Sequence, residues 1–293
     1  MSTIRQLLQK GKSSLSFQGI STPELDSEVL LAHALLKSRE FIHTYPREPV
    51  APEEVKEFLQ LLKRRRRGEP LAYIVGYKDF YGMRFVVNKN VLVPRPETEI
   101  LVREVLASVP GERNFNIWDI GTGSGCIGIA LAKILEKQNN LQKVYAIDIS
   151  KRALKMAQKN CTQHRAEKKV ELIHSDLLKT ILKNPDKYKM AFRDFNVVAA
   201  NLPYLTEKDY RHSPTIQKEP QKALKASENG LRCYRRLLEQ IKKIESSFLV
   251  IVEINPEQVP LLKEMVASIL PRAKLEIKTD LSGQDRVARI TIF

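Results

Sequence analysis

The chain has 293 residues, of which 43% are hydrophobic and 28% charged, a composition typical of folded globular proteins. No apolar run approaches the ~18 residues that a membrane-spanning helix needs, and the first residues lack the apolar core of a signal peptide. We therefore expect a cytoplasmic protein with no membrane partner. The three cysteines lie far apart without ligand spacing and the five histidines form no visible cluster, so neither a disulfide framework nor a metal site is expected.

The balance of charge is unusual. Basic residues outnumber acidic ones by 49 to 34, which gives a formal net charge of +15. Such an excess favours an anionic partner, such as RNA or a protein that works on RNA. A basic proteome with a solvated surface explains the same charge, so direct binding of nucleic acid is possible but not required.

Residues 1–78 are expected to form a small helical domain. The segment 22–24, Thr-Pro-Glu, combines an N-cap, a first-turn proline and an acidic residue, and Pro52 opens a second helix. The basic run at 63–67, Lys-Arg-Arg-Arg-Arg, closes that helix ahead of Gly68. We interpret this run as a solvated helix end, with a contact to RNA or to a ribosome-associated factor as the functional alternative.

Residues 79–94 have a different pattern. Two β-rich runs, at 80–87 and 91–93, are separated by the turn-like sequence at 88–90, Asn-Lys-Asn. The pattern predicts a hairpin that links the helical domain to the rest of the chain.

Residues 95–293 alternate between strands and helices, which indicates a mainly parallel sheet covered on both faces. Ligands bind to such sheets outside the carboxyl ends of the strands, near the point where strand order reverses. The expected strands are Asn116–Ile120, Val144–Asp148, Val170–His174, Asn196–Ala200, Phe248–Glu253 and two closing strands. The expected helices are Glu97–Ser108, Cys126–Leu135, Lys151–Asn160, Arg232–Lys243 and Pro256–Leu270.

The first two strand ends predict a site for an adenosine-type cofactor. The first strand runs into a glycine-rich loop within Asp119–Gly128, where the backbone can turn sharply and approach a ligand in front of a helix N-terminus. The second strand ends in Asp148, whose carboxylate can accept ribose hydroxyl bonds. Residues 123–128 also fit the pattern G-x-G-x-x-G, so this loop leaves a dinucleotide cofactor open.

Two further strand ends narrow the chemistry. The third predicted strand ends in Ser175, followed by Asp176 and Leu177, a polar and apolar pair suited to an adenine ring. The fourth runs into the loop Asn201–Tyr204, Asn-Leu-Pro-Tyr, at the edge of the sheet where the cofactor is expected. A plain turn would explain these residue types, but their position at a strand end favours a role in catalysis.

The motifs together carry a family resemblance. Asp119–Gly128 resembles motif I of class I S-adenosylmethionine methyltransferases, and Asn201–Tyr204 resembles the [N/D]-x-P-[Y/F] motif of enzymes that methylate planar nitrogens. The whole chain is similar to the HemK/PrmC family of release factor glutamine methyltransferases. The segments that carry this similarity are Pro94–Glu99, Glu219-Pro220 with Ala223-Leu224, Glu228–Leu231 and Asp280–Arg286.

This resemblance implies a fold, a reaction and a partner. It implies a Rossmann-like, mostly parallel seven-stranded sheet behind a helical domain that recognises the substrate. The implied reaction moves a methyl group from S-adenosylmethionine to the side-chain amide nitrogen of the glutamine in the Gly-Gly-Gln motif of peptide chain release factors. The cofactor leaves as S-adenosylhomocysteine.

The resemblance also assigns residues. For the cofactor, the backbone of the glycine loop is assigned to the methionine moiety, Asp148 to the ribose hydroxyls, and Asp176 with Leu177 to the adenine; the loop residues are Gly121, Thr122, Gly123, Ser124 and Gly125, and Asn201 also borders this pocket.

For the transfer, the Asn201 side-chain oxygen and the Leu202 carbonyl would accept the two N–H bonds of the target amide. Pro203 would stiffen the loop and Tyr204 would offer a flat face to the amide.

One position departs from the family pattern. The family usually has proline where this chain has Leu202, and Asn-Leu-Pro-Tyr is the form found in ribosomal RNA adenine dimethyltransferases. Those enzymes generally carry their small helical domain after the catalytic domain, unlike this chain. An RNA or DNA adenine amino-group methyltransferase is therefore the alternative reading, and a non-catalytic module that retains the cofactor fold is a third.

Overall fold

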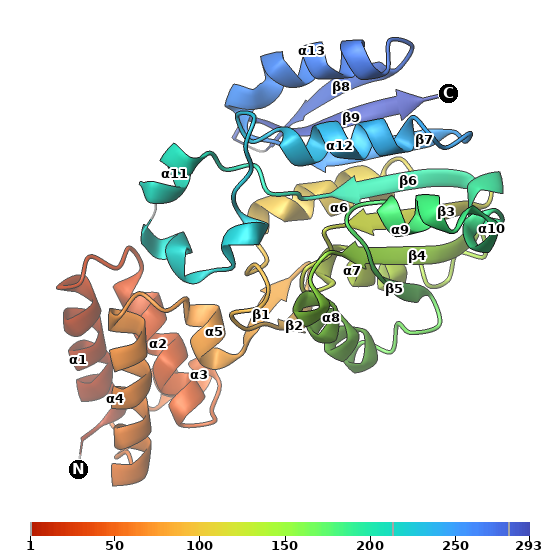
Figure 1. Ribbon diagram of the computed structural model, residues 1–293. Coiled ribbons are helices and arrows are strands. Elements are labelled where there is room, and N and C mark those ends of the chain that lie inside the picture. The colour runs from red at the N-terminus through yellow and green to blue at the C-terminus, as the bar shows by residue number, and fades with distance from the viewer. Residues whose placement is uncertain (1, 213, 281) are drawn as a thin grey trace. The chain divides into compact units, whose positions relative to one another are not determined.

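The computed structural model describes residues 2–212, 214–280 and 282–293, and the chain divides into two compact units. The first unit comprises Met1–Tyr77 with Pro214–Lys218, and the second comprises Lys78–Ser213 with Glu219–Phe293. Figure 1 labels the elements of both units. Each unit has apolar core clusters of its own.

The first unit is a bundle of short helices: α1 (Ile4–Ser16), α2 (Pro23–Ala34), α3 (Arg39–Thr44), α4 (Pro52–Arg66) and α5 (Leu71–Val75). Leucine, isoleucine and phenylalanine side chains at helical spacing fill its core, and Phe58 is fully buried there. Gly11 lets α1 approach α2 closely, since an added Cβ would lie 2.1 Å from Ser27 Oγ on α2.

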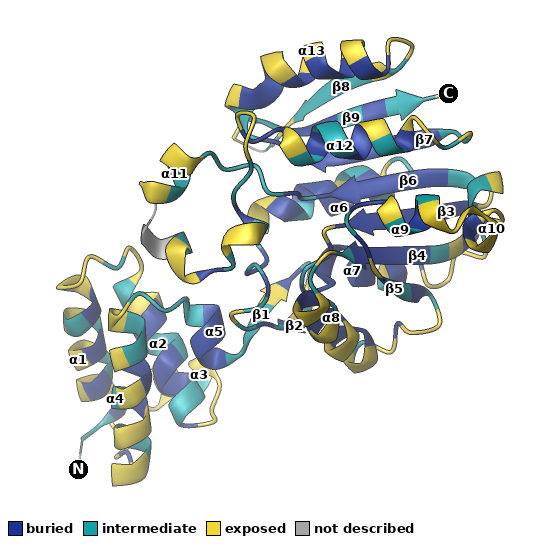
Figure 2. Ribbon diagram, viewed as in Figure 1, coloured by how far each residue is buried: buried dark blue, intermediate teal, exposed yellow. Residues whose placement is uncertain are grey.

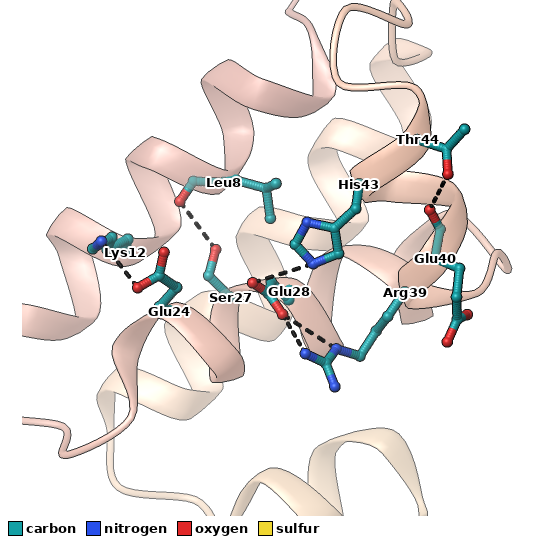
Figure 3. Close-up of polar contacts among 9 residues, drawn as sticks. All are labelled: Leu8, Lys12, Glu24, Ser27, Glu28, Arg39, Glu40, His43 and Thr44. Atoms are coloured by element: carbon teal, nitrogen blue, oxygen red, sulfur yellow. Dashed lines mark hydrogen bonds and ion pairs between the residues drawn. The ribbon is translucent and has the colours of Figure 1, made fainter.

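Polar contacts connect these helices to one another (Figure 3). The Glu28 carboxylate of α2 accepts hydrogen bonds from Arg39 of α3 at 2.5 and 3.2 Å, and His43 Nε2 lies 3.3 Å from its other oxygen. The Ser27 hydroxyl donates to the carbonyl of Leu8 at 3.2 Å. Side-chain hydrogen bonds from Arg39 and His43 lower the pKa of Glu28 against the opposing effect of its burial.

The predicted hairpin is present, but its turn was predicted at the wrong place. The strands are β1 (Tyr77–Phe80) and β2 (Met83–Val86), so the turn is at Tyr81 and Gly82 and not at 88–90. Both turn residues have positive φ, +49° and +72°, as a tight two-residue connection requires. The run 91–93, which was expected to be the second strand, is not a strand.

The second unit is built on a seven-stranded sheet with the order β5-β4-β3-β6-β7-β9-β8 (Figure 1). All strands except β9 run in one direction, because β9 pairs antiparallel with both β7 and β8. Strand order reverses between β3 and β6. The strands are β3 (Phe115–Ile120), β4 (Leu141–Asp148), β5 (Val170–His174), β6 (Phe195–Ala200), β7 (Phe248–Glu253), β8 (Lys274–Thr279) and β9 (Asp285–Ile292).

Helices cover both faces of this sheet, and the central strands are buried (Figure 2). One apolar cluster joins α6, α7 and α8 to one face, and a second joins α9, α10, α12 and α13 to the other. The helices are α6 (Glu99–Leu106), α7 (Cys126–Ile134), α8 (Lys151–Gln163), α9 (Lys179–Lys183), α10 (Pro185–Tyr188), α11 (Glu207–Arg211), α12 (Arg232–Ile241) and α13 (Val259–Ile269). Short 3-10 turns of this unit are η1 (Pro96–Thr98), η2 (Ala191–Arg193), η4 (Gln221–Ala223) and η5 (Pro256–Gln258), and η3 (Pro214–Lys218) belongs to the first unit.

The fold class expected from sequence is confirmed: a mostly parallel α/β sheet of seven strands, with helices preceding it in the chain. Two predicted helices begin later than expected, because a 3-10 turn precedes each of them. The segment predicted as Glu97–Ser108 is η1 followed by α6, and that predicted as Pro256–Leu270 is η5 followed by α13. In both cases a proline opens the turn.

Candidate functional site

The glycine-rich loop leaves β3 at the point where strand order reverses. Gly121, Gly123 and Gly125 all have positive φ, between +55° and +84°. A Cβ at Gly125 would lie 2.7 Å from Ile129 Cδ1, and one at Gly121 would lie 3.0 Å from Leu202 Cδ2. The loop therefore needs glycine both for its backbone conformation and for its close approach to neighbouring segments.

Asp148 is fixed beside this loop at the end of β4. Its Oδ2 accepts a hydrogen bond from the Gly123 amide at 2.9 Å, and its Oδ1 accepts one from the Ser150 amide at 2.8 Å. Burial raises the pKa of Asp148, and these two backbone hydrogen bonds lower it. Carboxylate oxygens can accept further bonds, and the role of Asp148 at the ribose hydroxyls stays a prediction.

Asp119, in β3 just before this loop, was not among the site residues predicted from sequence. It is fully buried, and its Oδ2 accepts hydrogen bonds from the Thr122 hydroxyl at 2.5 Å and from the Gly128 amide at 2.9 Å. Its Oδ1 has no partner among the described residues. Burial raises the pKa of Asp119 to about 6, against those two hydrogen bonds. A Cβ at Gly128 would lie 2.9 Å from Asp119 Oδ2, so the third glycine of the G-x-G-x-x-G pattern makes room for this carboxylate.

The two residues assigned to the adenine follow β5, and their side chains lie in different surroundings. The Asp176 carboxylate is partly exposed and forms an ion pair with Arg236 of α12 at 2.5 Å. Leu177 has a positive φ of +52° and is 9% exposed, within the core cluster on the α12 side of the sheet. A role for these side chains at the adenine stays a prediction.

The Asn-Leu-Pro-Tyr loop leaves β6, the strand beside β3. The Asn201 Nδ2 donates a hydrogen bond to the Thr98 hydroxyl at 2.9 Å, and no hydrogen bond from a described residue reaches its Oδ1. The Leu202 side chain is buried against the glycine loop. The Tyr234 hydroxyl lies 3.3 Å from the Leu202 carbonyl oxygen and 2.6 Å from that of Glu253.

Residues around Tyr204 hold the end of this loop. The side-chain amide of Gln258 donates to the carbonyls of Tyr204 and Asn229 at 3.0 and 2.9 Å. A Cβ at Gly230 would lie 2.0 Å from the Tyr204 carbonyl oxygen. Burial raises the pKa of Tyr204 to about 12, so its hydroxyl is neutral at physiological pH. The segment Glu228–Leu231 thus has a structural part in shaping the loop.

An open cavity of about 710 Å³ adjoins this loop. Tyr204 and Leu205 form one side of it, and residues after β7, before β9 and at the start of β9 form the rest: Asn255, Pro256, Glu257, Gly283, Gln284, Asp285 and Arg286. Of the segment Asp280–Arg286, Leu281 lies outside the described residues. The cavity leaves room for a peptide segment next to Tyr204.

The Pro94–Glu99 segment is tied to the Glu219-Pro220 segment by a buried carboxylate. Glu219 accepts a hydrogen bond from the Val93 amide at 3.0 Å, and its other oxygen pairs with Arg95. Glu99 accepts a bond from the Tyr81 amide at 2.8 Å. The ion-pair partner of Arg95 is therefore Glu219, 124 positions further along the chain.

In the helical unit, two arginines of the basic run at 63–67 are engaged within the unit. Arg65 pairs with the buried Asp26 at 2.6 Å, and Arg64 pairs with Glu69 at 2.6 Å. Lys63, Arg66 and Arg67 are exposed. Part of the run is thus structural.

Within the described residues, no group of His, Cys, Asp and Glu is arranged to hold a metal ion. The described helices are also all too short or too polar to cross a membrane.

The sheet order, with a single antiparallel strand between β7 and β8, differs from the dinucleotide-binding order 3-2-1-4-5-6. Together with the glycine loop and the Asn-Leu-Pro-Tyr loop, it defines a class I S-adenosylmethionine-dependent methyltransferase. A family model for a methyltransferase domain matches residues 112–282, and a model for the PrmC N-terminal domain matches residues 6–76. The methyl donor is S-adenosylmethionine, and the fixed carboxylate of Asp148 beside the glycine loop fits that molecule.

Curated relatives make the assignment more specific. The release factor glutamine methyltransferase of Bacillus cereus is 36% identical over 266 residues, which cover 89% of each chain. That of Rhodopirellula baltica is 33% identical over 294 residues, which cover 97% of this chain and 95% of the relative. The chain belongs to the release factor glutamine methyltransferase family. Among solved structures, the hMettl16 catalytic domain in complex with MAT2A 3′UTR hairpin 6 shares the fold, with a TM-score of 0.53 and 16% identity over 82% of this chain and 81% of that one.

Proposed function

We propose that this protein transfers the methyl group of S-adenosylmethionine to the side-chain amide nitrogen of the glutamine in the Gly-Gly-Gln segment of peptide chain release factors. The names of its relatives support the substrate. The observation that carries the chemistry is the state of Asn201, whose Nδ2 is held by Thr98 at 2.9 Å while Oδ1 is left to accept a hydrogen bond.

A carboxamide nitrogen is a poor nucleophile because its lone pair is delocalised into the carbonyl. The sulfonium of S-adenosylmethionine supplies an activated methyl group, so the protein contributes positioning and electrostatics rather than a strong base. Asn201 Oδ1 and the Leu202 carbonyl accept the two N–H bonds of the target amide. Both acceptors favour the positive charge that develops on the nitrogen, and the extra proton leaves after transfer.

The Leu202 carbonyl can serve in this way despite its neighbour Tyr234. A hydroxyl has one proton to donate, and the distance of 2.6 Å to the Glu253 carbonyl is shorter than the 3.3 Å to Leu202. The proton therefore goes to Glu253, and the Leu202 oxygen keeps its lone pairs. The leucine side chain points into the core, so the departure from the family pattern at this position leaves the acceptor in place.

Recognition of the folded release factor is assigned to the helical domain at 1–78, ahead of a linking segment at 79–94 and the methyltransferase domain at 95–293. The match of residues 6–76 to the PrmC N-terminal domain supports this division. The exposed cations Lys63, Arg66 and Arg67 suit an acidic protein surface. We also propose a cytoplasmic location, which the action of the relatives on release factors supports.

The test offers labelled S-adenosylmethionine with a release factor in one tube and ribosomal RNA in another, followed by mass spectrometry to locate the label. Label on the glutamine of the Gly-Gly-Gln peptide is expected. Label on RNA alone would overturn the proposal in favour of an adenine amino-group methyltransferase.

A further inference from the structure

The most unusual polar group near the Asn-Leu-Pro-Tyr loop is the carboxyl of Glu253, the last residue of β7. The residue is 2% exposed, and Oε2 has no hydrogen-bond partner among the described residues. No described lysine, arginine or histidine forms an ion pair with it, although Arg286 of β9 acts on it electrostatically. A carboxyl buried with an unmet oxygen is costly to the fold, which points to a functional reason for its presence.

The groups around this carboxyl come from three segments. Burial and the charge of Glu97 raise the pKa of Glu253, and its resulting value is about 7. The side-chain hydrogen bonds with Thr98 and Tyr204, and the charge of Arg286, lower the pKa.

A fourth neighbour approaches from α12 but meets only the backbone of Glu253. The Tyr234 hydroxyl donates to the Glu253 carbonyl at 2.6 Å, and burial raises the pKa of Tyr234 well above its usual value. Tyr234 therefore stays protonated across the physiological range. Because its proton goes to the backbone carbonyl, it does not compete with Thr98 for the side-chain carboxyl of Glu253.

Thr98 connects this carboxyl to Asn201. Its hydroxyl accepts a hydrogen bond from Asn201 Nδ2 at 2.9 Å and makes a side-chain hydrogen bond with Glu253. A hydroxyl can donate or accept on either side, so it does not by itself decide which end of an amide faces it. An ionised carboxylate can only accept. It therefore directs the Thr98 proton towards itself, and the hydroxyl lone pairs are left for an amide N–H.

We propose that Glu253 is a positioning residue for methyl transfer, which acts through the Thr98 hydroxyl to hold the Asn201 amide with Oδ1, and not Nδ2, facing the target nitrogen. In the opposite orientation the Asn201 N–H groups would meet the N–H groups of the target amide. The inference rests on the proposed function, since it concerns the orientation of the group that accepts the target amide.

This arrangement gives turnover a defined dependence on pH. Above the pKa of Glu253, near 7, the carboxylate is ionised. Thr98 then donates to Glu253 and accepts from Asn201, which fixes the orientation of the Asn201 amide. Below that pKa the carboxyl can donate to Thr98, which frees Thr98 to donate to the Asn201 oxygen and permits the wrong orientation. Turnover by the wild-type protein is therefore expected to fall as pH is lowered through about 7.

The experiment uses the full chain, labelled S-adenosylmethionine and a release factor, with kcat and KM measured from pH 6 to 9. Thr98→Val is expected to lower kcat about tenfold to a hundredfold, which corresponds to about 1.4–2.7 kcal/mol, the scale for a lost hydrogen bond. KM for the release factor and the calorimetric Kd of the cofactor should stay within about threefold, because neither depends on the chemical step. Thr98→Ser should restore most of kcat, and Glu253→Gln should resemble Thr98→Val.

Two further readouts separate positioning from a structural role. The fall in kcat below pH 7 should be lost in Thr98→Val, because Glu253 then no longer acts on Asn201. Thr162→Val is the matched control, since the Thr162 hydroxyl also accepts from a side-chain amide, that of Gln158 at 3.4 Å on the exposed face of α8, and its kcat should equal wild type. Wild-type kcat in Thr98→Val, or an unchanged pH profile, would overturn the inference. A wild-type protein that leaves the release factor unlabelled would instead overturn the proposed function.

Discussion

The two compact units of the chain treat their charged side chains differently. In the helical unit the buried carboxylate of Asp26 meets Arg65 at 2.6 Å, and Glu28 meets Arg39 at 2.5 Å (Figure 3). In the methyltransferase unit the buried Glu219 is also paired, with Arg95. Asp119 and Glu253 are as deeply buried as Asp26, yet each keeps one oxygen without a partner among the described residues.

This difference distinguishes two uses of polar groups. An opposite charge in contact compensates the cost of burying a carboxylate. Where that compensation is missing, the group remains available to a ligand or to a neighbour that contacts one. Substitutions at the strand ends should therefore lower turnover with little loss of stability. Substitutions in the ion pairs of the helical unit should lower stability with little effect on the chemical step.

The largest effect on turnover is expected for Asn201→Ala. In the proposed mechanism it removes an acceptor whose bond to the target amide strengthens as positive charge develops on the nitrogen. We expect kcat to fall about 100- to 1,000-fold, by analogy with the loss of one oriented hydrogen-bonding group in an active site. Methyl transfer to the release factor measures this, and calorimetry should show cofactor affinity within about threefold of wild type. Wild-type kcat in this variant would contradict the mechanism.

Arg65→Ala should show the opposite behaviour. It leaves Asp26, which is 2% exposed, without its partner. Removing one member of a buried ion pair costs about 3–5 kcal/mol, so the helical unit should unfold at markedly lower denaturant concentration. Arg66→Ala, one residue further along the same run, removes an exposed cation and should change the stability by less than about 0.5 kcal/mol. Equal stability of the two variants would show that the Arg65 pair is not structural.

The parts of the molecule that sequence predicted best are those on which chemistry or periodicity imposes residue types. Strand β3 and its glycine loop were placed correctly, since the positive φ values at Gly121 and Gly125 exclude most other residues. The hairpin turn was not, because Asn88–Asn90 carries stronger turn composition than Tyr81-Gly82. Composition registers turn residues wherever they occur, and only pairing between strands decides which of them close a hairpin.

The residues that sequence reasoning missed are brought together across long separations in the chain. Thr98 and Asn201 are 103 positions apart, and Glu253 is further still, so no local pattern connects them. The one available signal was the position of Glu253 at the end of a fully apolar strand, where parallel sheets gather their functional side chains. Asp148 also lies at the end of a parallel strand, and there a glycine loop at the expected spacing gave a second signal.

The smallest expected effect on stability concerns Gly230, which packs against the loop at Tyr204 in the methyltransferase unit. Gly230 has a φ of +84°, and an added Cβ would lie 2.0 Å from the backbone oxygen of Tyr204. Gly82 has a similar φ of +72° but nothing within 4 Å, so Gly82→Ala measures the conformational cost alone, about 1 kcal/mol.

Gly230→Ala adds a clash with backbone and should cost about 2 kcal/mol more than Gly82→Ala. Chemical denaturation of the two variants measures the difference. Because the clash displaces Tyr204, Gly230→Ala should also lower kcat, whereas Gly82→Ala should not. Equal stabilities would mean that the loop relaxes freely around position 230, in which case the segment Glu228–Leu231 would not hold Tyr204 in place. A larger loss of stability in Gly230→Ala would show that the loop around Tyr204 is rigid. The proposed fixed orientation of the nearby Asn201 amide requires such rigidity.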